Sequence, residues 1–308
     1  MPITFDGQVV IVTGAGQGLG RSYALELGRR GAAVVVNDVG GPGGEASAAA
    51  DAVASEIRSA GGKAVAAYDT VATPEGGQAI VDRALESFGT VDAVIHNAGV
   101  WRHKLFDEMT PDQLDPVLDV HLRGAFFVAR PAWAIMKAKG YGRIVLTSSS
   151  AGAFGRTSGT NYCSAKAGLL GLGRALSLEG AEHGIRTNCI LPVAPFQKLA
   201  TAPAALTPHL LSAGLPQEDS GPDQVTPMVI YLASAACAVN GEAFSAGGRR
   251  FGRVFIGVAD GWIGPAGEPA SAEDIEAHLS EIEDLDRFSA PGSAWEELGV
   301  IGRLRGGT

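Results

Sequence analysis

The sequence of 308 residues has few cysteines, few aromatic residues and few charges. The three cysteines are an odd, sparse set without metal-ligand spacing, which excludes a disulfide framework and predicts no metal site. We expect Cys163, Cys189 and Cys237 to be reduced thiols in the core. Charged residues make up only 19% of the chain and hydrophobic residues 46%, so the composition is not that of a disordered protein.

The chain also lacks long apolar runs and basic patches. The run from Val9 to Val12 is too short to span a membrane, and no basic segment followed by an apolar stretch opens the sequence. The net charge is −9, and no basic stripe indicates nucleic-acid binding. We therefore expect a soluble, cytoplasmic protein whose partner is a small-molecule substrate, not a membrane or a nucleic acid.

Short apolar runs alternate with helical patterns along most of the chain. Strands are expected at residues 8–14, 32–38, 63–69, 91–99, 142–150, 185–192 and 253–261. Apolar strands separated by helices indicate a parallel sheet that is buried on both faces. The predicted fold class is α/β, a doubly wound parallel sheet of Rossmann type with about seven strands, flanked by helices and followed by a C-terminal helical tail.

Two longer helices are predicted from their start signals. Thr110 suits the N-cap of a helix, Pro111 suits its first position, and Gln113 would complete a capping box with Thr110. These signals predict one helix over 111–138, with a kink near Pro131. An acidic amphipathic pattern predicts a second helix over 271–288, with Ser271 as its N-cap. Between them, the irregular, proline-rich residues 193–226 are typical of a lid or a disordered segment.

Glycines gather where the first strand meets the first helix, in TGAGQGLG at residues 13–20. Such a loop lets the backbone approach a pyrophosphate, which the free N–H groups of the helix N-terminus then bind. A glycine cluster alone also suits an ordinary tight turn, but the second strand ends at Asp38. A carboxylate there can accept hydrogen bonds from both adenosine ribose hydroxyls and repels the extra phosphate of NADP. The predicted cofactor is NAD, bound by a domain over 1–264 that an acidic extension over 265–308 follows.

Tyr162 and Lys166 are four residues apart on a predicted helix and therefore share one face. A phenol is a poor base at neutral pH, and a nearby ammonium favours its ionised form. The pair alone is a weak signal, because most such pairs lie on the surface. A strand that ends at Ser148, Ser149 and Ser150 precedes the pair and strengthens it.

At this point the chain resembles the short-chain dehydrogenase/reductase family, in TGAGQGLG (13–20), NAG (97–99), Ser149 and YCSAK (162–166). Within that family, VVVNDVGG, HLRGAFFVARPAW, YGRIVLTSS and GWIG are similar to the (3R)-hydroxyacyl-CoA dehydrogenase domain of peroxisomal type 2 multifunctional enzymes and to its stand-alone bacterial relatives. The family resemblance implies an oxidoreductase that is a homo-oligomer, expected to be a homodimer or homotetramer. The acidic extension is most simply a helix packed on the domain or on a neighbouring subunit.

The resemblance also implies roles for single residues. Tyr162 is expected to be the general base, Lys166 to lower its pKa, and Ser149 to hydrogen-bond the substrate oxygen. His121 stands where the family usually has asparagine, and it is either part of a proton relay or a packed core histidine. The expected cofactor contacts are Gly14, Gln17, Gly18, Leu19, Gly20, Asp38, Asp69, Thr70, Asn97, Ala98, Gly99, Tyr162, Lys166, Pro192 and Val193. Leu199 departs from the family, which often has threonine at that position.

Three functions follow from these residues and the resemblance. The first is oxidation of a (3R)-3-hydroxyacyl-CoA to the 3-oxoacyl-CoA. The second keeps the chemistry but acts on a 17β-hydroxysteroid or another bulky secondary alcohol, and the third is a non-catalytic NAD-binding protein. The phosphates of CoA favour a basic rim, for which the candidates are Arg102, Lys104, Lys198, Arg249, Arg250 and Arg253.

Overall fold

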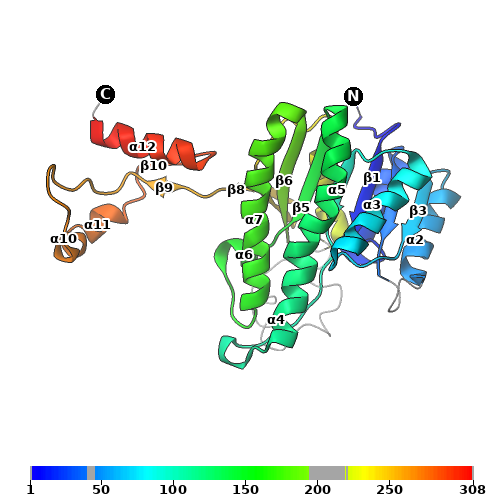
Figure 1. Ribbon diagram of the computed structural model, residues 1–308, viewed down its shortest axis with the longest axis horizontal. Helices are drawn as coiled ribbons and strands as arrows, with labels where there is room; N and C mark the ends of the chain where they lie inside the picture. Colours follow the sequence, from blue (N-terminus) through cyan, green and yellow to red (C-terminus); the bar gives the residue numbers. More distant parts are fainter. Residues whose placement is uncertain (1, 40–45, 194–218, 220, 307–308) are drawn as a thin grey trace. The chain divides into compact units, whose positions relative to one another are not determined.

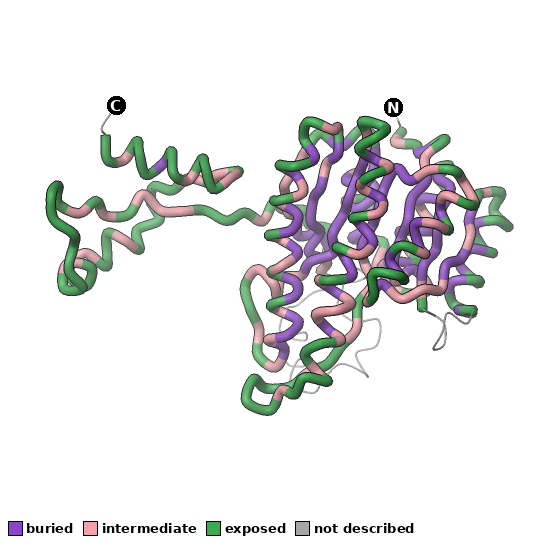
Figure 2. Tube along the Cα trace, in the orientation of Figure 1, coloured by how far each residue is buried: buried purple, intermediate pink, exposed green. Residues whose placement is uncertain are grey.

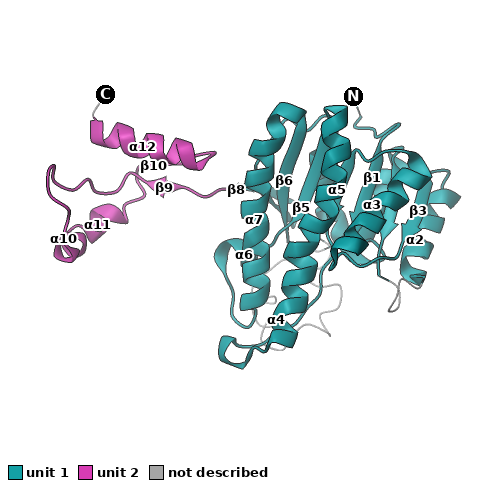
Figure 3. Ribbon diagram, viewed as in Figure 1, with its two compact units in different colours: residues 1–253 teal, residues 254–308 magenta. Residues whose placement is uncertain are grey.

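The computed structural model describes residues 2–39, 46–193, 219 and 221–306. The chain forms two compact units, residues 1–253 and 254–308, which Figure 3 shows in different colours. The sequence analysis placed the boundary after Gly264 instead. Most of the segment expected to be a lid or disordered, with Lys198 and Leu199, lies outside the described residues.

An eight-stranded sheet forms the centre of unit 1, in the order β3-β2-β1-β4-β5-β6-β7-β8 (Figure 1). The strands are β1 (Val9–Thr13), β2 (Ala33–Asn37), β3 (Lys63–Ala67), β4 (Ala93–His96), β5 (Gly142–Thr147), β6 (Ile185–Pro192), β7 (Ala243–Gly247) and β8 (Arg250–Val254). The pairings from β3 to β7 are parallel. The predicted α/β fold with a parallel sheet is confirmed, with eight strands where about seven were expected.

The last two strands differ from the sequence prediction. The strand expected at 253–261 is divided, because β8 ends at Val254 and Val258–Ala259 form a separate short strand outside this sheet. The sequence of β7, AFSAG, has no β-branched residue and therefore carries little strand signal. A tight turn at Gly248 and Arg249, both with positive φ, leads from β7 into β8.

Helices cover both faces of this sheet. On one face, α1 (Gly18–Arg29), α2 (Ala48–Ser59) and α9 (Thr226–Ala233) pack against side chains such as Val10 and Val12. On the other face, α3 (Pro74–Phe88), α5 (Gly124–Lys139) and α7 (Thr160–Gly180) pack against Val9 and Ile11. Figure 2 shows the strands as the most buried part of the unit. Apolar residues on both faces of each strand explain the continuous hydrophobic runs in the sequence.

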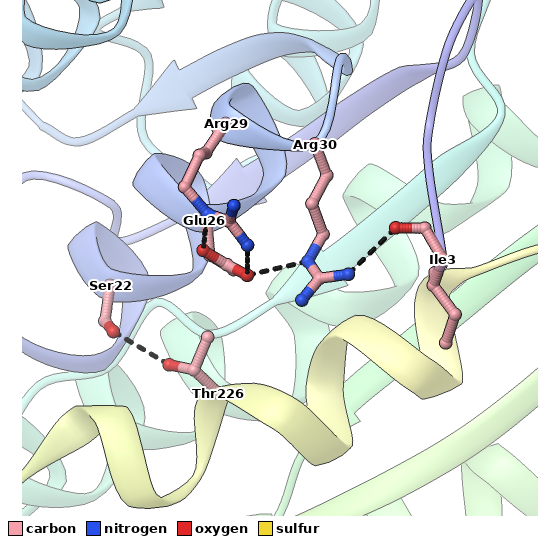
Figure 4. Close-up of polar contacts among 6 residues, drawn as sticks. All are labelled: Ile3, Ser22, Glu26, Arg29, Arg30 and Thr226. Carbon is pink, nitrogen blue, oxygen red and sulfur yellow. Dashed lines mark hydrogen bonds and ion pairs between the residues drawn. The ribbon is translucent and has the colours of Figure 1, made fainter. Parts of the chain in front are cut away.

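Polar contacts hold α1 in place against α9 and the amino-terminal segment (Figure 4). The Ser22 and Thr226 hydroxyl oxygens lie 2.8 Å apart, and the Arg30 guanidinium donates to the carbonyl oxygen of Ile3 at 2.8 Å. Arg30 also donates to the Glu26 carboxylate at 2.6 Å. Because α1 begins at the glycine-rich loop, these contacts fix the helix that positions that loop.

The helix expected over 111–138 is interrupted. It consists of α4 (Pro111–Leu118), a π-helical turn, η2 (Asp119–Arg123), and α5. The irregularity therefore lies at His121 and not at Pro131, which is inside α5. A π-turn inserts one extra residue into the helix and is frequent at functional sites. The apolar periodicity did not reveal it, because the helical stripe continues on both sides.

Unit 2 has little core of its own. Its short strands β9 (Val258–Ala259) and β10 (Phe288–Ser289) pair antiparallel, and its helices are α10 (Ala272–Ala277), α11 (Leu279–Ile282) and α12 (Ala294–Gly306). Among the described residues of this unit only Val300 is buried. Ser271 caps α10 as expected, but the helix predicted over 271–288 is divided into α10 and α11, and α11 ends at Ile282. Acidic residues at positions 281, 283 and 284 repel the negative end of the helix dipole there.

Two further observations concern the whole described chain. No helix within these residues is both long and apolar enough to cross a membrane. All three cysteines are free thiols; Cys189 and Cys237 are buried, whereas Cys163 is only half-buried. The expectation of a core position is therefore wrong for Cys163.

Candidate active site

A cavity of about 640 Å³ opens at the carboxyl ends of β1 and β4. The strand order reverses between these two strands, and ligands of doubly wound sheets bind in the crevice at this point. Of the residues predicted from the sequence, the cavity is lined by Gly14, Gln17, Leu19, Asp38, Thr70, Asn97, Ala98, Gly99, His121, Ser149, Tyr162, Lys166, Pro192 and Val193. Gly18, Gly20 and Asp69 do not line it.

The glycine-rich loop at one end of the cavity tolerates no side chain at several positions. Gly14 has a φ of +63°, and a Cβ there would lie 2.7 Å from the Cα of Ala98. A Cβ on Gly20 would lie 2.1 Å from the carbonyl oxygen of Gly14. The absence of a side chain at Gly20 therefore allows α1 to pack closely against the loop, although Gly20 itself does not line the cavity.

Asp38 joins the loop to the end of β2. Its carboxylate accepts a hydrogen bond from the backbone amide of Gly16 at 2.7 Å, and a Cβ on Gly16 would lie 2.6 Å from the same oxygen. The carboxylate thus lies at the cavity wall beside the loop. Asp69 contributes its backbone carbonyl, which accepts from the Asn37 side chain at 2.9 Å.

Asn97 fastens β4 to the loop after β1. Its side-chain amide donates to the carbonyl oxygens of Thr13 and Gly14, both at 3.1 Å. In return, the Thr13 hydroxyl accepts from the backbone amides of Asn97 and Ala98, both at 3.0 Å. This network fixes the two strand ends that form the crevice. An asparagine suits this position because its side-chain amide can donate to both backbone carbonyls.

Ser149, Tyr162 and Lys166 meet at the other end of the cavity. Ser149 is the N-cap of α6 (Ser150–Phe154), and its hydroxyl oxygen accepts from the backbone amide of Ala151 at 3.1 Å. Tyr162 and Lys166 are buried, one turn apart on α7. The Lys166 ammonium donates to the backbone carbonyl of Thr147 at the end of β5.

Burial is the largest influence on the pKa values of Tyr162 and Lys166. Burial raises the pKa of Tyr162 above that of an ordinary phenol, and hydrogen bonding with Ser149 and the charge of Arg156 act in the opposite direction. Burial also lowers the pKa of Lys166 to about 7. Arg156 is thus a cation whose charge acts on the phenol, and the expected effect of Lys166 on the pKa of Tyr162 stays a prediction.

His121 is a buried, neutral imidazole against the cavity. Its Nε2 atom lies 3.1 Å from the backbone amide and 2.9 Å from the carbonyl oxygen of Val100. Its Nδ1 atom is buried without a hydrogen-bond partner among the described residues. Burial holds its pKa well below the usual range, and the Lys166 charge adds to this effect. The ring packs edge-on against Tyr162, with the centroids 5.2 Å apart.

Trp101 and Arg156 also line the cavity, and sequence reasoning missed both for this role. They lie in loops after β4 and α6, where no residue pattern marks them. The expected basic rim is weaker than predicted, because Lys104, Arg249 and Arg253 each form an ion pair with a carboxylate. Arg156 is the basic side chain other than Lys166 that reaches the cavity in the described part of the chain.

Comparisons with known proteins extend this description. The family model described as short chain dehydrogenase matches residues 8–195. A putative short-chain type dehydrogenase/reductase of Mycobacterium tuberculosis is 43% identical over 288 residues, covering 92% of this chain and 97% of the relative. A hydroxyacyl-CoA dehydrogenase of the same organism is 34% identical over 319 residues, covering 97% and 88%.

Multifunctional proteins match as well. Peroxisomal multifunctional enzyme type 2 of Mus musculus is 40% identical over 304 residues, which are 97% of this chain but only 40% of the relative. The solved structure of the full-length Drosophila melanogaster enzyme of that name has a TM-score of 0.80 and 31% identity, covering 98% of this chain and 50% of the other. The chain therefore spans half or less of the length of these multifunctional relatives.

Proposed function

Because the chain belongs to the short-chain dehydrogenase/reductase family and is an oxidoreductase, we propose that it oxidises a (3R)-3-hydroxyacyl-CoA to the 3-oxoacyl-CoA with NAD. The observation that carries the proposal is that Ser149, Tyr162 and Lys166 lie in the same cavity as Asp38. The name of the hydroxyacyl-CoA dehydrogenase relative, which aligns over nearly the whole chain, supports this substrate class.

The residues present fit a nicotinamide dinucleotide. The N-terminus of α1 has no side-chain cap among the described residues, so its backbone amides are available to a pyrophosphate beside Gln17 and Leu19. Asp38 would accept hydrogen bonds from the adenosine ribose, and its negative charge favours NAD over NADP. When bound, the cofactor supplies the hydride acceptor of the reaction.

The chain's own residues supply proton transfer and orientation. The Ser149 oxygen accepts from Ala151 and its hydroxyl hydrogen-bonds with Tyr162, so a bound substrate oxygen would take the Ser149 proton in place of the phenol. The ionised phenol of Tyr162 takes the proton of the substrate hydroxyl as the carbinol carbon loses its hydride. Lys166 donates to the Thr147 carbonyl at the end of β5, and it would bind the nicotinamide ribose when the cofactor is present.

A substrate panel with purified protein tests the proposal. We expect NADH formation with a (3R)-3-hydroxyacyl-CoA and at least about a hundredfold loss in kcat on Tyr162→Phe, since a general base contributes 10²–10⁴-fold. The panel includes the free 3-hydroxy acid and a 17β-hydroxysteroid. Turnover of the steroid without turnover of any thioester would replace the substrate assignment. NAD binding without turnover of any alcohol would indicate a non-catalytic protein.

A further inference from the structure

Arg156 lies over the ring of the proposed base. Its guanidinium carbon is 4.9 Å from the centroid of the Tyr162 ring and 5.5 Å from that of Trp101. The Trp101 and Tyr162 rings are stacked with their centroids 4.5 Å apart. Arg156 therefore completes a cluster of one cation and two aromatic rings at the substrate end of the cavity.

The local structure holds the guanidinium in this position. Nη2 of Arg156 lies 3.1 Å from Nδ1 of His103, and the same Nδ1 lies 3.2 Å from the carbonyl oxygen of Ser158. A guanidinium can only donate, so it donates to Nδ1 in the tautomer that carries the imidazole proton on Nε2. Burial lowers the pKa of His103, which keeps this acceptor neutral. A Cβ on Gly159 would lie 2.9 Å from Nη2, so the glycine leaves room for the guanidinium. No carboxylate in the described ranges forms an ion pair with Arg156, and its charge is not neutralised.

The groups around the Tyr162 ring come from several elements. Lys166 lies on the same helix, with its ammonium 5.7 Å from the ring centroid, and His121 faces the ring from the π-turn. The remaining neighbours are Ser149 at the start of α6, Cys163 next along α7, and Trp101 and Arg156 in the loops. His121 is neutral, so Lys166 and Arg156 are the two cations near the phenol among the described residues.

These two cations differ in the pH range over which they stay charged. Burial lowers the pKa of Lys166 to about 7, so its ammonium loses its proton as the pH rises above neutrality. A guanidinium stays charged throughout that range. The Arg156 guanidinium carbon is also nearer the ring centroid than the Lys166 ammonium, at 4.9 Å against 5.7 Å, and the charge of Arg156 lowers the pKa of Tyr162.

We infer that Arg156 is a positioning residue for the base, whose permanent charge over the ring face favours the ionised, proton-accepting form of Tyr162. The negative charge of a phenolate is shared with its ring, so a cation on the ring face stabilises the ionised form more than the neutral one. The inference rests on the proposed function, because it concerns the base of that same site. It adds Arg156 to Lys166 as a cation that favours ionisation of the phenol.

A titration of the phenol tests the inference without any substrate. The phenolate absorbance of the full chain is followed against pH, and the curve of Tyr162→Phe is subtracted to isolate Tyr162. We expect Arg156→Gln to move this titration upward by about one pH unit, a tenfold smaller phenolate fraction at a given pH. Arg156→Lys is expected to recover at least half of that shift, because it keeps the charge. Arg123→Gln, which removes an exposed arginine paired with Asp119, is the control and should leave the curve in place.

Each outcome decides the question. An unshifted titration in Arg156→Gln, or equal shifts in Arg156→Gln and Arg156→Lys, would overturn the inference, because charge would then not be the cause. If the glutamine variant does not fold, Arg156→Met replaces it in the same comparison. The acidic limb of the kcat/KM profile with NAD should move together with the titration. A shifted titration in a protein that oxidises no hydroxyacyl-CoA would leave the inference standing and refute the proposed substrate.

Discussion

The backbone amide of Gly16 donates a hydrogen bond to the carboxylate of Asp38 over 2.7 Å, which joins the glycine-rich loop to the end of β2. Through this contact one carboxylate has two tasks, since it also faces the cavity. The loop geometry and the cofactor preference therefore depend on the same residue. The first prediction tests the cofactor preference, and the second tests the packing of the glycine-rich loop.

Replacing Asp38 with alanine should change the cofactor preference. Hydrogen bonds to a charged group are each worth about 1.5–3 kcal/mol, so we expect kcat/KM with NAD to fall at least about tenfold. Loss of the negative charge should raise kcat/KM with NADP relative to NAD. Asp82→Ala is the control, because Asp82 pairs with Gln78 on α3 and does not line the cavity. An unchanged ratio of the two cofactors in Asp38→Ala would contradict the role of this carboxylate.

Gly20→Ala should damage the loop although Gly20 does not touch the cavity. Its Cβ would meet the backbone oxygen of Gly14 at 2.1 Å, and a backbone atom cannot move aside cheaply. We expect weaker NAD binding in calorimetry and a loss of about 1–3 kcal/mol in the free energy of unfolding. The control Gly171→Ala lies in α7 with no atom within 4 Å of the new Cβ, and should be neutral or slightly stabilising. Equal stability of the two variants would refute the packing argument.

The two readings of His121 are separated by a pair of variants. If it takes part in a proton relay, His121→Asn should keep activity within about tenfold, whereas His121→Leu should lose at least about a hundredfold in kcat. The leucine variant also leaves the backbone groups of Val100 without a partner, which costs about 1–3 kcal/mol. Activity and unfolding are measured on both proteins. Equal activity in the two variants would make His121 a packing residue only.

Lys166 should make the stability of the protein depend on pH. Its folded-state pKa of about 7 is below the usual value of 10.5, so between these values the unfolded chain binds more protons. The cost of burying the charge is complete below pH about 7 and disappears as the pH rises towards 10.5. We therefore expect wild type to gain stability relative to Lys166→Met over that range, as measured by denaturant unfolding. The exposed substitution Lys137→Met should show no such trend, and a parallel pH dependence of wild type and Lys166→Met would contradict the lowered pKa.

The sequence predicted the sheet and both ends of the cavity because their signals are local. Glycines at 14, 18 and 20, the end of β2 at Asp38, and the turn from Tyr162 to Lys166 are each read within a few residues. Once the strands are parallel, their carboxyl ends meet and bring these residues together. The structure adds the physical reason for the residue type at single positions, such as the clash that a side chain at position 20 would cause.

The features that the sequence did not predict depend on contacts between distant segments. Arg156 and Trp101 are separated by more than one helix in the chain, and only the fold stacks them on Tyr162. The π-turn at Asp119–Arg123 is invisible in a stripe that continues through it. The ionisation of Tyr162 was predicted from Lys166 alone, because burial cannot be read from spacing. Burial proved to be the largest effect on that phenol.

The central claim is that this site oxidises the hydroxyl of a (3R)-3-hydroxyacyl-CoA with NAD. The most direct test is the initial rate of NADH formation with the two enantiomers of one 3-hydroxyacyl-CoA, for wild type and Tyr162→Phe. We predict turnover of the (3R) enantiomer by wild type, little turnover of the (3S) enantiomer, and loss of activity in the variant. Equal rates with both enantiomers, or no turnover of either by a folded protein that binds NAD, would contradict it.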